Sequence, residues 1–178
     1  HFMRGDFERA FAAGDSLGFV DALALSAMGR EAEALDRLAM DEASFQPMMV
    51  AWRGALRASL EGRPDEALRT VAELVESFRD PEAHFYGARI LARIGEPDRA
   101  LDVLERVVGT GFVCEPILRS DPWLDPLRDA PRFEAVLADA AAGRRRAVAV
   151  FEDEGGPRLL GLHAANAPTF ILGSAPEN

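Results

Sequence analysis

The sequence predicts an all-α fold in which helical hairpins stack along the middle of the chain. Three observations support this prediction. Matching residues recur every 33 positions, apolar residues within each copy follow the 3.6-residue period of a helix, and a glycine lies between the two helical stretches of each copy. One hairpin cannot bury both of its apolar faces, so the copies are expected to stack and to stabilise one another.

The repeat covers residues 15–114 and comprises three copies, at about 15–47, 48–80 and 81–114. Five columns match in all three copies. Their residues are Ala22, Ala55 and Ala88; Gly29, Gly62 and Gly95; Ala34, Ala67 and Ala100; Leu35, Leu68 and Leu101; and Leu38, Val71 and Leu104. Residues 1–14 precede the first copy and are expected to supply a partial N-terminal repeat helix.

The third copy shows why each repeat should form a helical hairpin. Gly95 is expected to end the first helix in the left-handed conformation that glycine adopts without strain. Pro97 follows in the first turn of the second helix, where its missing N–H is not needed. Leu101 and Leu104 then lie on one apolar stripe. If that stripe is buried, replacing Leu101 or its equivalent Leu68 with Ala should cost about 2–5 kcal/mol.

The segments GRPDEALRTVAEL (62–74) and GEPDRALDVLERVV (95–108) resemble the tetratricopeptide repeat. The shared features are a small residue late in the first helix, a glycine at the turn, and Ala-Leu in the second helix. The resemblance covers residues 15–114, with a partial earlier unit, GDFERAF, at 5–11. It implies a right-handed superhelix of helical pairs, with a concave groove lined by the first helices.

The sequence also departs from the family pattern. The interval is 33 rather than about 34 residues, and Gly18, Ala51 and His84 replace the aromatic residue that the family carries early in each repeat. Ankyrin repeats share the interval of 33 residues and are the second candidate. Their Thr-Pro-Leu-His opening is absent, however, and the helices here are expected to be longer.

The C-terminal third is expected to close the open end of the last repeat. Prolines in residues 115–130 predict two short helices, and residues 130–154 predict one long capping helix. Six residues are expected to cover the last hairpin: Trp123, Leu124, Leu127, Phe133, Val136 and Leu137. The phrase DPWLDPLRDAPRF (121–133) resembles the closing segment of repeat regions in bacterial serine/threonine kinases, adenylate cyclases and winged-helix regulators. Residues 155–178 are expected to form an irregular tail or linker.

The resemblance implies that one column of first-helix residues lines a partner-binding groove. The predicted groove residues are Phe19, Leu23, Trp52, Arg53, Leu56, Phe85, Arg89 and Arg93. Aromatic side chains surrounded by arginines suit a peptide that carries apolar and acidic groups. The alternative interpretation is that the three aromatics pack between adjacent hairpins, and the sequence leaves both open.

Three other features are interpreted as structural. His84 lies in a repeat helix and is expected to pack half-buried rather than bind a metal, and Cys114 is expected to be a buried, inert thiol. The run Arg144–Arg146 is expected to be a solvated helix face; an acidic or phosphate-bearing partner is the alternative. No metal, cofactor or catalytic residue is predicted, because no nucleophile elbow, phosphate-binding glycine loop or zinc pattern is present.

Composition excludes some function classes. Thirty acidic residues and twenty arginines give a formal net charge of −10 without any lysine, which disfavours nucleic-acid binding. No apolar run reaches the roughly 20 residues that a membrane span needs. The single cysteine favours a reducing, cytoplasmic compartment. The start at His1 is expected to be a vector remnant or an internal cut, so the chain is interpreted as a fragment.

These observations lead to three functional hypotheses. The first is a non-enzymatic module for protein interaction or regulation, acting as a scaffold in a larger bacterial signalling protein. The second is a self-association module that forms a homo-oligomer, with the C-terminal tail docked in its own or a neighbouring groove. The third is an enzyme whose site is unrecognised.

Overall fold

The computed structural model describes residues 1–13, 18–39 and 45–161, and every regular element in these ranges is helical. The chain divides into two units, residues 1–144 and 145–178, with the boundary inside α9. The elements are η1 (Phe2–Arg4), α1 (Phe7–Ala13), α2 (Phe19–Ala27), α3 (Glu31–Leu38), α4 (Pro47–Leu60), α5 (Pro64–Ser77), α6 (Pro81–Arg93), α7 (Pro97–Gly109), α8 (Glu115–Ser120), η2 (Pro122–Leu127), α9 (Pro131–Asp153) and α10 (Gly156–Leu159).

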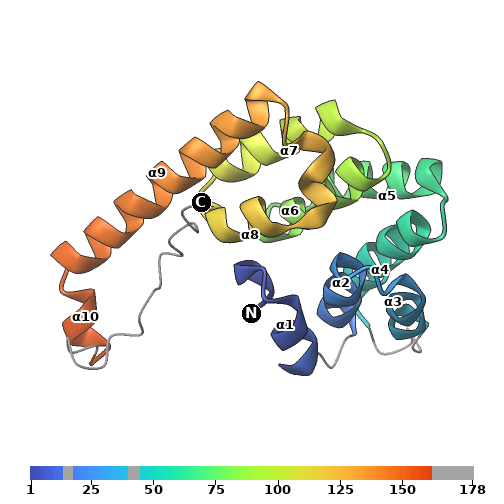
Figure 1. The fold of residues 1–178 in the computed structure, drawn as a ribbon, viewed down its shortest axis with the longest axis horizontal. Coiled ribbons are helices and arrows are strands. Elements are labelled where there is room, and N and C mark those ends of the chain that lie inside the picture. The colour runs from blue at the N-terminus through green and yellow to red at the C-terminus, as the bar shows by residue number, and fades with distance from the viewer. Residues whose placement is uncertain (14–17, 40–44, 162–178) are drawn as a thin grey trace, which may run out of the picture. The chain divides into compact units, whose positions relative to one another are not determined.

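In the first unit, adjacent helices pack as antiparallel pairs: α2 with α3, α4 with α5, and α6 with α7 (Figure 1). Each pair falls within one of the three sequence repeats. This arrangement confirms the prediction of an all-α protein built from stacked helical hairpins. The right-handed superhelix stays a prediction.

The turns inside the hairpins have the expected chemistry. Gly29, Gly62 and Gly95 follow α2, α4 and α6 with φ values of 73°, 71° and 87°, a conformation that other residues rarely adopt. Pro64 and Pro97 occupy the first turns of α5 and α7. Glycine therefore ends the first helix of each pair, and in the second and third pairs proline starts the next helix, as the sequence predicts.

The repeat columns form the core of the stack. Nine residues of these columns have no exposed surface: Ala22, Ala55, Ala88, Ala34, Ala67, Ala100, Leu38, Val71 and Leu104. Alanines at the hairpin contacts allow the paired helices to approach closely, and the larger residues fill the space between them. The leucine column is less uniform, because Leu101 is buried whereas Leu35 and Leu68 are only half-buried.

This difference separates two substitutions that the repeat alone treats as equivalent. Leu101→Ala should lower the free energy of unfolding by about 2–5 kcal/mol, because the side chain is 3% exposed. Leu68→Ala should cost only about 1 kcal/mol, because part of its surface is already in water. Urea denaturation of both variants measures the two losses. Equal losses would contradict the burial that distinguishes the two positions.

The predicted long C-terminal helix is present, and its role as a cap of the repeats stays a prediction. η2 packs against α6 and α7, and Trp123, Leu124 and Leu127 are buried. Phe133 and Val136 of α9 are buried as well, and Leu137 is partly buried. α9 runs from Pro131 to Asp153, close to the predicted 130–154.

The segment after α9 is partly regular, which corrects the expectation of a wholly irregular tail. Gly155 ends α9 with a φ of 72°, and Pro157 then lies in the first turn of the short helix α10. Residues 162–178 lie outside the described part of the chain. Among the residues that the structure describes, no helix is both long and apolar enough to cross a membrane.

Candidate protein-interaction surface

The predicted groove residues are almost all inside the protein. Seven of the eight are at most 5% exposed: Phe19, Leu23, Trp52, Arg53, Leu56, Phe85 and Arg89. The eighth, Arg93, has a side chain that is 26% exposed. The expectation of an open column along the first helices is therefore wrong for the chain on its own. Contact between these residues and a partner stays a prediction.

Packing between hairpins buries two of the three aromatics, and packing within the third repeat buries Phe85. Phe19 meets the ring of Tyr86 edge-on at 5.5 Å, and Phe85 stacks on Phe112 at 5.0 Å. Trp52 lies against Gly87, where an added Cβ would be 3.4 Å from the indole ring. For Phe19 and Trp52, this is the alternative that the sequence left open. Burial and a hydrogen bond to Glu82 raise the pKa of Tyr86 far above its usual value, so this phenol stays neutral.

Arg53 of α4 caps the end of the neighbouring hairpin and does not face a groove. Its Nη2 donates to the carbonyl oxygen of Leu38 at 2.9 Å, and its guanidinium lies 4.7 Å from the ring centroid of Phe45. Leu38 is the last residue of α3, where free carbonyl groups give the helix end a partial negative charge. Arg53 therefore satisfies the end of one hairpin from the first helix of the next.

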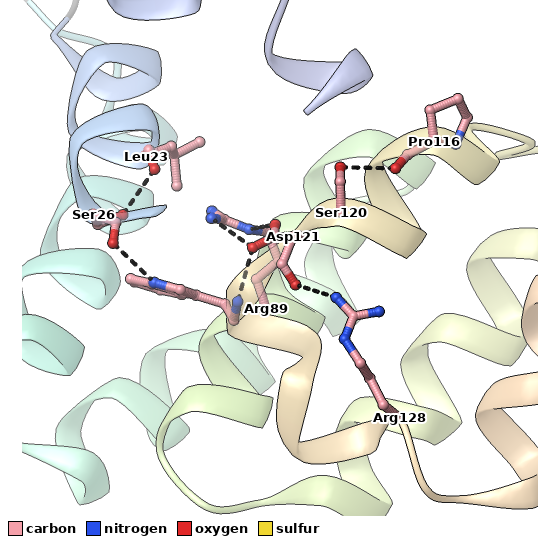
Figure 2. Close-up of polar contacts among 8 residues, drawn as sticks. Leu23, Ser26, Arg89, Pro116, Ser120, Asp121 and Arg128 are labelled. Atoms are coloured by element: carbon pink, nitrogen blue, oxygen red, sulfur yellow. Dashed lines mark hydrogen bonds and ion pairs between the residues drawn. The ribbon is translucent and has the colours of Figure 1, made fainter. Parts of the chain in front are cut away.

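A buried ion pair lies on the face of α6 (Figure 2). Arg89 donates through Nε and Nη2 to the carboxylate of Asp121, and neither side chain has exposed surface. Asp121 also accepts a hydrogen bond from the backbone N–H of Trp123 at 3.0 Å, so it caps η2. The carboxylate of Asp121 thus neutralises Arg89 and also caps the start of η2.

Two rings enclose this ion pair. The guanidinium carbon of Arg89 lies 5.0 Å from the ring centroid of Phe2 and 4.7 Å from that of Trp123. The indole N–H of Trp123 donates to the carbonyl oxygen of Ser26 in α2 at 3.4 Å (Figure 2). Phe2 and Trp123 come from η1 and η2, which lie before and after the repeats. Together with Arg89 and Asp121, they form what we call the Arg89 cluster.

The Arg89 cluster explains why the predicted groove is closed at α6. Side chains of η1 and η2 cover Arg89, whereas contacts between hairpins bury Phe19 of α2 and Trp52 of α4. Sequence analysis missed Asp121 as the counter-ion. A usable signal was present, because Arg89 occupies the column that holds Leu23 and Leu56, and an arginine in a buried column needs a carboxylate.

An open groove lies instead between the second helices α5 and α7. It has a volume of about 290 Å³. Val71, Leu91 and Val103 form an apolar floor, and half-buried Leu68 and Val75 line its walls. Ala72 of α5 is exposed within the lining. The second hairpin meets the third where α5 packs on α6, and α5 and α7 flank the groove above that contact.

The charged side chains at the edge of this groove differ in whether they form ion pairs. Asp102 accepts a hydrogen bond from Arg132 at 2.6 Å, and Arg132 also bonds Glu105 at 2.8 Å. The hydrogen bond from Arg132 holds the pKa of Glu105 below its usual value. Arg106 is exposed and makes no ion pair within the described ranges. The guanidinium of Arg106 is therefore available to a partner beside the apolar floor.

The histidine, the cysteine and the arginine run noted in the sequence lie in surroundings that suit a structural role. His84 is buried rather than half-buried, and its Nε2–H donates to the carbonyl oxygen of Phe78 at 2.6 Å. Cys114 is half-buried rather than buried, and its burial raises the pKa of the thiol. Arg145 and Arg146 are exposed, as expected for a solvated face. In the ranges that the structure covers, no group of three or more possible metal ligands occurs.

Comparison with known proteins leaves the family open. No protein-family model matches the chain, and searches of curated proteins and of solved structures find no match. The resemblance to the tetratricopeptide repeat therefore rests on the repeated residues and on the helical hairpins that they form.

Proposed function

We propose that this chain is a non-enzymatic protein-interaction module of the tetratricopeptide type, and that it serves as a regulatory segment of a larger bacterial protein. The observation that carries the proposal is the open apolar groove between α5 and α7. The first-helix face is occupied by the protein's own side chains, so the partner surface is placed on the second helices.

The lining of the groove indicates the chemistry of the partner. An apolar floor flanked by two helices accepts one or two large apolar side chains of a peptide or a helix. Arg106 favours a carboxylate next to those side chains, because a charge-assisted hydrogen bond is stronger than a neutral one. Glu76, at the opposite side of the lining, disfavours a second carboxylate there. The expected partner is a short segment with apolar and acidic residues.

A peptide library displayed on phage and selected on the purified chain tests this proposal. Selection should enrich peptides in which an acidic residue lies close to large apolar residues. Ala72→Arg should abolish their binding, because the arginine fills the groove from an exposed position without disturbing the core. Arg106→Glu should weaken binding by about tenfold or more, since it turns an attraction into a repulsion.

Two matched variants control for general surface effects. Ala138→Arg adds the same side chain at an exposed position of α9, and Arg69→Glu makes the same charge change at an exposed position of α5. Both should bind the selected peptides like the unmodified chain. If Ala72→Arg binds as well as Ala138→Arg does, the groove between α5 and α7 is not the partner surface.

A further inference from the structure

The second unit carries an exposed apolar surface. Within the described residues, all of the strongly exposed large apolar side chains lie in residues 145–161: Val148, Val150, Phe151, Leu159 and Leu160, at 47%, 60%, 40%, 78% and 67% exposure. Val148, Val150 and Phe151 lie within a single turn of α9 and are distributed around the helix. A Cβ added to Gly156 would collide with the ring of Phe151, so α10 packs directly against the end of α9. Apolar surface gathered in one place usually marks a contact site.

The charges around this surface are arranged symmetrically along the helix. Arg144–Arg146 precede the apolar stretch Ala147–Phe151, and Glu152–Glu154 follow it. Ala149 lies at the midpoint, with Arg145 four residues before it and Asp153 four residues after it. Arg145, Arg146, Glu152 and Asp153 are all exposed.

We propose that this stretch of α9 pairs in antiparallel orientation with the same stretch of a second copy of the chain. A twofold axis through Ala149 places Arg145 opposite Asp153 of the second copy and Arg146 opposite its Glu152. Val148 and Val150 point about 100° to either side of Ala149, so they border the paired face on its two edges. Each copy supplies the charges that the other needs.

The order of charges along this stretch favours an antiparallel second copy of the chain over other partners. In a parallel pair, arginines would lie opposite arginines and acids opposite acids, which is unfavourable. A partner of one charge sign would meet repulsion at one end of the stretch. Only a helix with the reversed order of charges matches both ends, and the reversed copy of this helix has that order. The pairing is independent of the groove between α5 and α7, so it extends the proposed function without relying on it.

A charge-exchange experiment on the full chain tests the pairing. One variant, Arg145→Glu with Arg146→Glu, makes the whole stretch acidic. The other, Glu152→Arg with Asp153→Arg, makes it basic. Each variant alone should be monomeric by sedimentation equilibrium, with at least about a tenfold weaker association than the unmodified chain, because like charges then face each other. An equimolar mixture should form a dimer that contains one copy of each.

The controls separate this pairing from misfolding and from other contacts. Circular dichroism should be the same for both variants and the unmodified chain, because all four positions are exposed. Association of the unmodified chain should weaken as salt is raised. The proposal is overturned if the unmodified chain is monomeric at all concentrations, if either variant alone still dimerises, or if the mixture stays monomeric. Persistence of the dimer in either variant would place the contact elsewhere on the chain.

Discussion

Replacing Asp121 with Ala should lower the free energy of unfolding by about 3–5 kcal/mol, because it leaves the fully buried guanidinium of Arg89 without a counter-charge. The same change removes the acceptor for the backbone N–H of Trp123 and so weakens the start of η2. Urea denaturation followed by circular dichroism measures the loss. Tryptophan fluorescence should report it as well, because Trp123 lies over the arginine.

Two variants make this prediction specific to the buried pair. Arg89→Met combined with Asp121→Asn removes both charges while retaining an oxygen that can cap η2. This double variant should be more stable than Asp121→Ala, since no charge is left uncompensated. Asp125→Ala removes the partner of Arg128 in an exposed pair and should cost less than about 1 kcal/mol. A loss in Asp125→Ala as large as that in Asp121→Ala would contradict the role assigned to the buried pair.

Replacing Phe85 with Ala should also cost about 3–5 kcal/mol, because its ring is fully buried and stacks on Phe112. The lost ring would leave a cavity where α6 meets the segment that follows α7. Chemical denaturation measures the change. Phe151→Ala is the matched control, because Phe151 is 40% exposed, and it should change the stability of the first unit by less than about 1 kcal/mol.

This result also decides how binding experiments on the predicted groove residues are interpreted. Trp52→Ala together with Phe85→Ala removes two core side chains, so loss of a partner would first of all indicate unfolding. One outcome would instead support partner binding at the first helices. If Phe85→Ala is as stable as the unmodified protein and still loses its partner, the first helices must open enough to bind it.

Local features of the helices could be predicted from the sequence because they depend on local chemistry. Gly62 and Gly95 end their helices, and Pro64 and Pro97 start the next ones, for reasons that involve only nearby backbone atoms. The buried alanine columns were also predictable, since helical period and a repeated interval together identify the face that must be covered. Leu35 and Leu68 of the leucine column were the exceptions, because their exposure depends on which helices pack beside them.

The candidate site was much less predictable, and Arg89 shows why. Its column position matched Leu23 and Leu56, but sequence could not distinguish an arginine lining a groove from one buried beside a carboxylate. Asp121 lies 32 residues further along the chain, and Phe2 approaches from the opposite end. No local pattern links these positions, because they meet only after the hairpins have stacked.

The sequence by itself determined that the chain forms helices, where most of them end, and that they pair as repeated hairpins, because helix period, turn residues and proline act over a few positions. It also carried the palindromic order of charges about Ala149. Only the tertiary structure decided which faces are covered. The segments before and after the repeats cover Arg89 of α6, and the hairpins bury Phe19 and Trp52 against one another. The groove between α5 and α7 stays open, because burial depends on which distant elements pack together.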